Sequence, residues 1–345
     1  MSVETAVYEK LSCGSTICGV CPRKCVIKEG ERGFCGVREN QDGKLMSLVY
    51  GKAVSSNIDP IEKKPLFHFA PGSRALSVAT VGCNLRCDFC QNFRISQDWT
   101  EISGRDLSPD DLVEKANKRG CSGIAYTYTE PTIFLEYARD TMKRASPELY
   151  NIFVSNGYMT KEALDEVSDF LDGINVDLKG GEEFYRKHCG VPDMEPIYTI
   201  LGELSDRDIH TEVTNLIIPG VNDTDDEIRK RVRWIKENMG SDTPVHFSRF
   251  HPDFKMLDSK PTPVETLERA MDIGKEEGLN YVYCGNVPGH RSESTYCPNC
   301  NSLLVKRVGF RVEEFNLKRG MKCHECDEDI NIRGEKFIPE KLFKD

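Results

Sequence analysis

The chain has 345 residues, which is long enough for one large domain with small appendages and too long for a peptide module. Its 46 basic and 56 acidic side chains give a formal net charge of -10, which argues against a protein that coats nucleic acid. No stretch approaches the roughly 18 apolar residues of a membrane helix. Residues 1–10 also lack the basic-then-apolar pattern of a signal peptide. We therefore expect a cytoplasmic protein that does not enter a membrane.

The sequence contains 15 cysteines, and in the reducing cytosol metal ligation explains so many thiols better than disulfides do. Their spacing predicts three metal sites. The three groups are Cys18, Cys21, Cys25 and Cys35; Cys83, Cys87 and Cys90; and Cys297, Cys300, Cys323 and Cys326. Outside the groups, Cys121, Cys189 and Cys284 are expected to be plain buried residues, and Cys13 is an alternative ligand for the first group.

After residue 72, short β-rich runs alternate with helical stretches, as in repeated βα units that build a parallel sheet. Strands are predicted at 75–81, 123–129, 150–155, 173–178, 210–218, 245–250 and 281–285. Helices are predicted, among others, at 108–119, 224–238 and 262–277, each beginning at a Ser or Thr that can cap it. Six right-handed βα units predict a partial (β/α)6 barrel, an α/β fold with its active site at the carboxyl ends of the strands. An open doubly wound sheet is the alternative.

The domain organisation follows from where the βα alternation begins and ends in the sequence. Residues 1–72 lack it and hold the first cysteine group, so we predict a cysteine-rich N-terminal cap pinned by metal. Residues 73–289 form the predicted barrel, and residues 290–345 form a second small metal-binding appendage.

The two terminal cysteine groups differ in regularity. Cys297-x2-Cys300 and Cys323-x2-Cys326, with a β-like segment between them, predict two knuckles of a zinc ribbon, for which rubredoxin-type iron is the alternative occupant. The N-terminal C-x2-C-x3-C-x9-C is explained most simply by a four-cysteine zinc site, and a second iron–sulfur cluster for electron delivery is the alternative. The compact C-x2-C-x2-C-x3-C spacing of ferredoxins is absent.

The most informative segment is Thr80-Val81-Gly82-Cys83-Asn84-Leu85-Arg86-Cys87-Asp88-Phe89-Cys90, directly after the first predicted barrel strand. Its C-x3-C-x2-C spacing has no adjacent fourth Cys or His, which a structural zinc site would need. Three thiolates on a tight loop can instead hold three irons of a [4Fe-4S] cubane and leave the fourth iron open.

This motif resembles that of radical S-adenosylmethionine (radical SAM) enzymes. The resemblance implies that the open iron chelates the methionine moiety of S-adenosyl-L-methionine, and that one electron cleaves the sulfonium to a carbon radical, expected to be 5′-deoxyadenosyl. In that family an aromatic residue precedes the third cysteine and packs near the adenine, and Phe89 holds this place.

Further positions resemble the pyruvate formate-lyase activating branch of the family. Tyr128-Thr129-Glu130-Pro131 resembles its Gly-Glu-Pro stretch, with Tyr128 and Thr129 in place of the usual glycines. Val154 stands where the branch often has a cation-binding Asp, so no monovalent cation is predicted. The resemblance implies that the cofactor is bound by Glu130, Ser155, Asn156, Asp177, Lys179 and His251.

Taken together, the cysteine-rich start, Glu62-Lys63-Lys64-Pro65-Leu66, Gly82-Cys83-Asn84, Tyr283-Cys284-Gly285-Asn286 and the terminal ribbon resemble the AmmeMemoRadiSam-system radical enzymes over nearly the whole chain. The resemblance implies Memo-like and AMMECR-type proteins as partners, and an electron donor such as flavodoxin or ferredoxin.

The leading hypothesis is thus a radical SAM oxidoreductase that activates or modifies a substrate in the manner of pyruvate formate-lyase activating enzyme. Fold-level similarity does not identify a substrate, so modification of RNA or of a small molecule stays open. The hypothesis from a different class is a non-catalytic zinc scaffold. The middle cysteine motif distinguishes the two, because only the enzyme requires iron there.

Overall fold

The computed structural model describes residues 2–343. The chain forms two compact units that do not follow chain order. Unit 1 comprises the residues up to 58 together with 75–174 and 185–209, and unit 2 comprises 59–74, 175–184 and the residues from 210 onward. No helix among the described residues is both long enough and apolar enough to cross a membrane.

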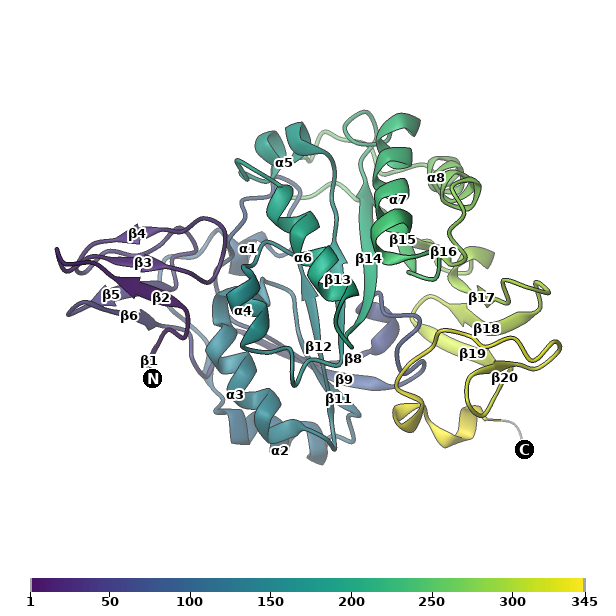
Figure 1. Ribbon diagram of the computed structural model, residues 1–345, viewed down its shortest axis with the longest axis horizontal. Coiled ribbons are helices and arrows are strands. Elements are labelled where there is room, and N and C mark those ends of the chain that lie inside the picture. Colours follow the sequence, from purple (N-terminus) through teal and green to yellow (C-terminus); the bar gives the residue numbers. More distant parts are fainter. Residues whose placement is uncertain (1, 344–345) are drawn as a thin grey trace. The chain divides into compact units, whose positions relative to one another are not determined.

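The largest sheet has eight strands in the order β16-β15-β14-β13-β12-β11-β9-β8 (Figure 1). In unit 1, β11 pairs in parallel with β9 and β12, and in unit 2, β15 pairs in parallel with β14 and β16. All seven strands expected from the sequence are present. The strands follow one another in the sheet in chain order, without the reversal of a doubly wound sheet. The α/β class is therefore confirmed, and the doubly wound alternative is wrong. The count of six barrel units stays a prediction. The strands are β8 (Ser55–Pro60), β9 (Arg74–Ala79), β11 (Gly123–Tyr126), β12 (Tyr150–Ser155), β13 (Gly173–Asp177), β14 (His210–Ile217), β15 (Val245–Arg249) and β16 (Val282–Gly285).

Two of the predicted helix starts are confirmed. Helix α2 (Pro109–Lys118) begins with a capping box between Ser108 and Asp111, and the Thr224 side chain caps α7 (Asp225–Met239). Helix α8 (Val264–Glu276) differs, because the hydroxyl of Thr262 donates to the Ile217 carbonyl at 2.6 Å instead of capping the helix. The other helices are α1 (Phe93–Ser96), α3 (Leu135–Ala145), α4 (Lys161–Asp165), α5 (Glu182–His188) and α6 (Glu195–Ser205), with 3-10 turns η1 (Ile61–Lys63), η2 (Pro131–Phe134), η3 (Arg291–Glu293), η4 (Glu335–Phe337) and η5 (Glu340–Leu342).

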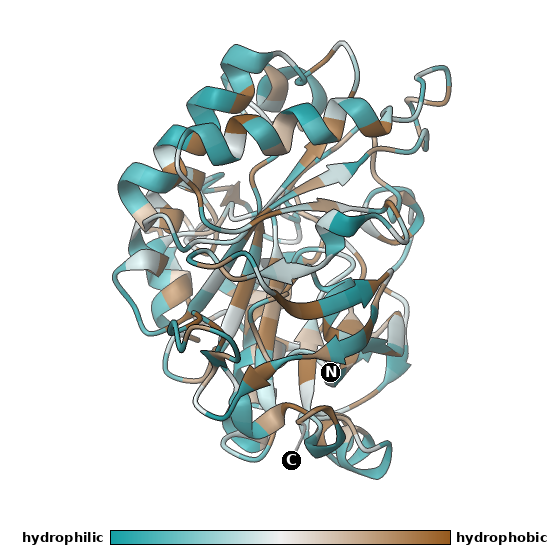
Figure 2. Cartoon of the chain, turned by 90° about the vertical axis from the view of Figure 1, so that its right-hand side faces the viewer, coloured by the Kyte–Doolittle hydropathy of each residue, from teal (hydrophilic) through white to brown (hydrophobic). Residues whose placement is uncertain are grey.

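Strands and helices differ in how they bury apolar surface. Every residue of β11 is buried, as expected for a parallel strand covered on both faces. Helices α2 and α3 pack side by side in unit 1, as do α7 and α8 in unit 2 (Figure 1). Figure 2 shows both hydrophobic and hydrophilic residues along the helices, and hydrophobic residues along the inner strands. The hydrophobic core of each unit therefore lies between its strands and its helices.

The N-terminal part of unit 1 contains small antiparallel sheets. One has the order β1-β6-β5, a second has the order β2-β3-β4, and β7 pairs with β10. A buried ion pair between Arg38 and Glu136 of α3, 3.0 Å apart, ties this part to the helical layer. The strands are β1 (Val3–Glu4), β2 (Tyr8–Lys10), β3 (Thr16–Cys18), β4 (Val26–Ile27), β5 (Arg38–Gln41), β6 (Lys44–Ser47), β7 (Lys52–Ala53) and β10 (Arg105–Asp106).

The C-terminal part of unit 2 is a ribbon in which Leu304, Val305 and Phe315 are buried, in an apolar cluster that also contains Phe67 and Tyr283. Its strands are β17 (Thr295–Tyr296), β18 (Leu303–Val308), β19 (Arg311–Phe315), β20 (Leu317–Lys318) and β21 (Lys322–Cys323). The 59–69 segment also belongs to unit 2. Its Phe67 and His68 backbone amides donate to the buried carboxylate of Glu212, at 3.0 and 2.7 Å, so the segment is fixed by a buried charge.

Candidate functional site

The C-x3-C-x2-C loop follows β9 directly, as the sequence predicts. Gly82, just before the first cysteine, has φ +97, and a Cβ there would lie 2.7 Å from Val37 Cγ1 and 2.8 Å from the Cys35 carbonyl oxygen. Only glycine fits this position. The loop therefore runs in close contact with the N-terminal cysteine segment.

Arg86 and Gln97 hold the loop by its backbone carbonyls. The Arg86 guanidinium donates to the carbonyls of Cys83, Leu85 and Phe34 at 2.8, 2.9 and 2.6 Å, and Gln97 Nε2 donates to the Cys87 carbonyl at 2.9 Å. These bonds fix the backbone while the cysteine side chains make other contacts. The loop is thus preorganised independently of any ligand that its thiols bind.

The three thiols of this loop suit a cluster better than a single ion. Among residues 2–343, the only group of three or more Cys, His, Asp or Glu whose ligand atoms all lie within 4.8 Å is the C-terminal cysteine group. The backbone amide of Leu85 donates to Cys83 Sγ at 3.4 Å, which favours a thiolate. Burial, followed by the nearby charge of Glu130, raises the pKa of Cys83. A thiolate at this position consequently needs a bound cation, and the site fits an iron–sulfur cluster.

Glu130 links the end of β11 to the end of β12, beside Cys83. Its Oε1 accepts from the Thr132 amide, the Thr132 hydroxyl and the Ser155 hydroxyl at 3.0, 2.6 and 2.8 Å, and its Oε2 accepts from the Asn156 amide at 2.8 Å. Burial raises the pKa of Glu130, whereas these four hydrogen bonds oppose the shift. The sequence-predicted residues Glu130, Ser155 and Asn156 are therefore brought together in unit 1.

The sequence analysis did not select Asn84 as a site residue. It is buried, and its side-chain amide donates to the Tyr158 carbonyl at 2.7 Å and accepts from Asn156 Nδ2 at 2.8 Å. Asn156 Nδ2 also lies 3.9 Å from Cys83 Sγ. The only sequence signal was its place beside Cys83, because its partner is 72 residues away in the chain.

Tyr128 replaces a glycine of the resembled motif yet keeps a backbone that suits glycine. Its φ is +63, in the left-handed region that few bulky residues adopt. The next residue, Thr129, donates its hydroxyl to the Thr80 carbonyl at 2.9 Å. The turn into Glu130 therefore has a glycine-like path despite the substitution.

The remaining predicted cofactor residues have different surroundings. Phe89 is buried in unit 1. In unit 2, Lys179 Nζ lies 2.6 Å from Asp177 Oδ2, so the two charges expected at this strand end are paired. Asn222 Nδ2 donates to the Lys179 carbonyl at 2.6 Å, which ties the Pro219-Gly220 turn to the same place. The His251 side chain is exposed after the end of β15.

The C-terminal cysteines form a compact tetrad in unit 2. Cys297 Sγ lies 3.6 Å from Cys326 Sγ, and Cys300 Sγ lies 3.7 Å from Cys323 Sγ. Two knuckle turns present these thiols, and four residues after the first cysteine of each turn, Asn301 and Asp327 both have φ +59. Tetrahedral zinc with bonds of about 2.3 Å requires sulfurs about 3.8 Å apart. The tetrad fits zinc by its size.

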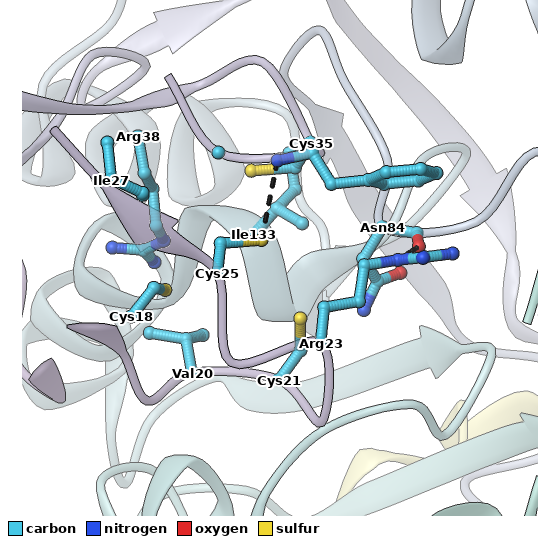
Figure 3. Close-up of a pocket in the computed structure, with 12 residues that line it drawn as sticks. Cys18, Val20, Cys21, Arg23, Cys25, Ile27, Cys35, Arg38, Asn84 and Ile133 are labelled. Carbon is cyan, nitrogen blue, oxygen red and sulfur yellow. Dashed lines mark hydrogen bonds between the residues drawn. The ribbon is translucent and has the colours of Figure 1, made fainter. Parts of the chain in front are cut away.

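The N-terminal cysteines line a small cavity of about 20 Å³ in unit 1 (Figure 3). The side chains of Cys18, Cys21, Cys25 and Cys35 surround it together with Arg23, Arg38, Asn84 and Ile133, among others. The ungrouped cysteines behave as expected, since Cys121, Cys189 and Cys284 are buried, whereas Cys13 is exposed and faces a separate pocket.

Comparison with known proteins agrees with these features. The Radical SAM superfamily model matches residues 77–235. The uncharacterized protein MJ0808 of Methanocaldococcus jannaschii is 47% identical over 332 residues, covering 95% of this chain and 99% of that protein. The putative glycyl-radical enzyme activating enzyme MJ1632 of the same organism is 24% identical over 171 residues, covering 47% of this chain and 63% of that protein.

A solved radical SAM methyltransferase from Sphaerobacter thermophilus resembles the fold, with a TM-score of 0.51 and 15% identity, covering 63% of this chain and 67% of that one. The chain therefore belongs to the same family as MJ0808, and its residues 77–235 are similar to the radical SAM superfamily.

Proposed function

We propose that this chain is an enzyme that holds a [4Fe-4S] cluster at Cys83, Cys87 and Cys90 and cleaves S-adenosylmethionine reductively. The observation that carries the proposal is the arrangement around Cys83. Its loop is fixed by Arg86 and Gln97, its thiols are not gathered for a single ion, and the Glu130 network lies beside it. A structural zinc site would have neither the spread thiols nor the buried polar network.

When bound, the cluster supplies the electron that cleaves the sulfonium and so produces a carbon radical, in this proposal 5′-deoxyadenosyl. The protein contributes binding, orientation and exclusion of water. Because Thr132, Ser155 and Asn156 all donate to Glu130, one buried carboxylate holds the ends of β11 and β12 in a fixed arrangement. Charge-assisted hydrogen bonds in such a dry setting are stronger than neutral ones.

Glu130 and Asn156 are the unit 1 groups proposed to face the amino acid end of the cofactor. A zwitterionic amino acid needs a carboxylate near its ammonium group and donors near its carboxylate, and these two side chains supply one of each. Phe89 is proposed to pack near the adenine. The assignments of Asp177, Lys179 and His251 to the cofactor stay predictions of the resemblance.

The substrate class proposed first is a protein glycine. The support is the relative MJ1632, whose name describes a putative glycyl-radical enzyme activating enzyme. Memo-like and AMMECR-type partners, an electron donor such as flavodoxin or ferredoxin, and the AmmeMemoRadiSam type rest on the sequence resemblance. The first product to seek is therefore a persistent carbon radical on a partner protein, visible by electron paramagnetic resonance (EPR).

The test of the proposed function is anaerobic incubation of the iron-reconstituted protein with dithionite and S-adenosylmethionine, followed by mass spectrometry of the nucleoside products. We expect 5′-deoxyadenosine from the wild type and none from Cys83→Ala, Cys87→Ala or Cys90→Ala. The buried cysteine variant Cys121→Ala is the matched control and should retain the product. Full turnover in any of the three loop variants would reject the assignment.

A further inference from the structure

The sequence allows either zinc or an iron–sulfur cluster at the N-terminal cysteine group. The distances between the sulfur atoms distinguish these two occupants. A tetrahedral zinc requires sulfurs about 3.8 Å apart, and the C-terminal tetrad of the same chain shows such spacing, at 3.6 and 3.7 Å. The N-terminal thiols do not gather in this way. Within residues 2–343, no three of them have sulfurs that all lie within 4.8 Å of one another.

The N-terminal thiols instead surround a space. All four cysteines line the same small cavity, of about 20 Å³, and their side chains extend toward its interior (Figure 3). In an iron–sulfur cluster each cysteine binds a different iron, so the ligand sulfurs stand apart with the inorganic core between them. Four separated thiols around one cavity have the ligand arrangement of such a cluster, although the cavity, at about 20 Å³, must widen to admit the core.

The cavity walls suit an anionic cluster. Four thiolates around a [4Fe-4S] core leave a net negative charge, and Arg23 and Arg38 both belong to the lining. The charge of Arg38 is balanced by Glu136, so Arg23 is the lining residue that supplies positive charge. The backbone amide of Phe34 donates to Cys25 Sγ at 3.5 Å. Val20, Ile27 and Ile133 complete an apolar wall that limits the access of water. Positive charge, an amide donor and apolar shielding are the features by which a protein tunes such a cluster.

The cavity also abuts the loop that carries the barrel cysteines. Asn84, the neighbour of Cys83, is part of its lining, and Arg23 Nε donates to the Asn84 carbonyl at 2.6 Å. The carbonyl of Cys35 lies against Gly82, on the other side of Cys83. The two cysteine groups therefore share a wall within unit 1.

From this geometry we infer that Cys18, Cys21, Cys25 and Cys35 bind a second [4Fe-4S] cluster, next to the cluster of the barrel loop. The site assignment stands independently of the proposed function. The role of the second cluster does rest on the proposed function. One electron enters the second cluster from a one-electron donor protein and passes to the barrel cluster, and no bond is made or broken between the two sites.

The first experiment counts metal in the full-length protein after anaerobic reconstitution with iron and sulfide. The wild type should bind about eight irons, in two cubanes. The triple variant Cys83→Ala/Cys87→Ala/Cys90→Ala and the double variant Cys25→Ala/Cys35→Ala should each bind about four. Cys13→Ala is the matched control, because Cys13 lies close in sequence but faces another pocket, and it should retain about eight irons.

The triple variant decides the outcome without any change in the N-terminal segment. If it binds zinc and no iron, or if the double variant keeps all the iron of the wild type, the second cluster is refuted. A wild type whose iron is lost only in the double variant would reject the proposed function and support this site. An unfolded double variant, seen by circular dichroism, leaves the triple variant to give the answer.

A second experiment tests the shared wall by EPR of the fully reduced protein. Two reduced clusters in adjacent sites couple magnetically, so the wild type should show broadened or split lines. The triple variant should show one uncoupled cluster with simple lines. Iron in both sites with identical, uncoupled spectra in the wild type and the triple variant would contradict the adjacency.

Discussion

Asn156 Nδ2 donates to Asn84 Oδ1 at 2.8 Å and so joins the end of β12 to the cysteine loop that follows β9. The backbone amide of Asn156 donates to Glu130 at 2.8 Å, and its Nδ2 also lies 3.9 Å from Cys83 Sγ. One asparagine thus contacts the predicted cluster loop and the predicted cofactor carboxylate at the same time. These hydrogen bonds explain how Glu130, the predicted cofactor contact, and Cys83, the predicted cluster ligand, can stay at a fixed distance from each other.

Replacing Glu130 tests this coupling. Glu130→Ala should leave the iron content and visible spectrum intact while weakening S-adenosylmethionine binding roughly ten- to a hundredfold, since a charge-assisted bond is worth about 1.5 to 3 kcal/mol. It should also lower the free energy of unfolding, because Ser155 and Asn156 lose their acceptor. Calorimetry and urea denaturation measure the two effects.

Asp177→Ala should likewise keep the iron and weaken S-adenosylmethionine binding. Affinities within twofold of the wild type in both variants would show that these residues are purely structural.

Gly82 tests the close approach of the two cysteine segments. Gly82→Ala places a Cβ 2.8 Å from the Cys35 carbonyl oxygen, so the backbone must shift and iron at the barrel loop should fall. Gly309→Ala is the matched control, because Gly309 also has a positive φ, of +61, but has no atom within 4 Å of the added carbon. Iron analysis after reconstitution compares the two. Equal iron in both variants would show that the approach is not needed for cluster binding.

The buried pair of Arg38 and Glu136 should be essential to the N-terminal sheets. Arg38→Met removes the partner of a buried carboxylate and should cost about 3 to 5 kcal/mol of stability. The double variant Arg38→Met/Glu136→Leu should be more stable than Arg38→Met alone, because no uncompensated charge remains. Urea denaturation of the metal-loaded proteins measures this. A double variant less stable than the single one would show that the other bonds of Glu136, such as that from the Ala6 amide, dominate.

The C-terminal tetrad should bind zinc and couple it to local folding. Cys297→Ala or Cys323→Ala should release one zinc per chain and increase the proteolysis of residues after 290, because metal binding and folding are linked in a segment this small. Cys284→Ala is the control, since Cys284 is buried outside the tetrad. Unchanged zinc content and protease resistance in the tetrad variants would count against zinc at this site.

Acid should destabilise unit 2 through two buried groups. Burial by itself raises the pKa of Glu212, but hydrogen bonds from His210 and His246 outweigh it and hold the pKa well below the ordinary value. Burial lowers the pKa of His68 from 6.5 to about 3. Between pH 6.5 and 3 the unfolded chain therefore binds more protons at His68, and stability falls as the pH falls, by up to about 1.4 kcal/mol per pH unit for this one group.

The measurement is the free energy of unfolding between pH 7 and pH 5, with zinc content followed in parallel. His68→Gln should give a smaller pH slope than the wild type, whereas the exposed-site control His251→Gln should give the wild-type slope. A slope that His68→Gln leaves unchanged would assign the acid sensitivity to other groups.

The sequence alone determined those features that depend on local chemistry. Capping at Ser108 and Thr224 involves residues three positions apart, so the starts of α2 and α7 can be read from short segments. The strand positions follow from hydrophobic runs, and the cysteine spacings indicate which thiols act together. Thr262 shows the limit of this reading, because its hydroxyl bonds to Ile217, 45 residues away, rather than capping α8.

Only the tertiary structure shows how the thiols of each cysteine group are arranged in space. Each terminal group has four cysteines, and the sequence does not give the distances between their sulfurs. In the C-terminal group two pairs of sulfurs lie 3.6 and 3.7 Å apart, whereas the N-terminal group lines a cavity. The pairing of Asn84 with Asn156 was equally hidden. Distances between thiols, and contacts between residues far apart in sequence, depend on how packed elements bring distant backbone segments together, and no local pattern encodes that packing.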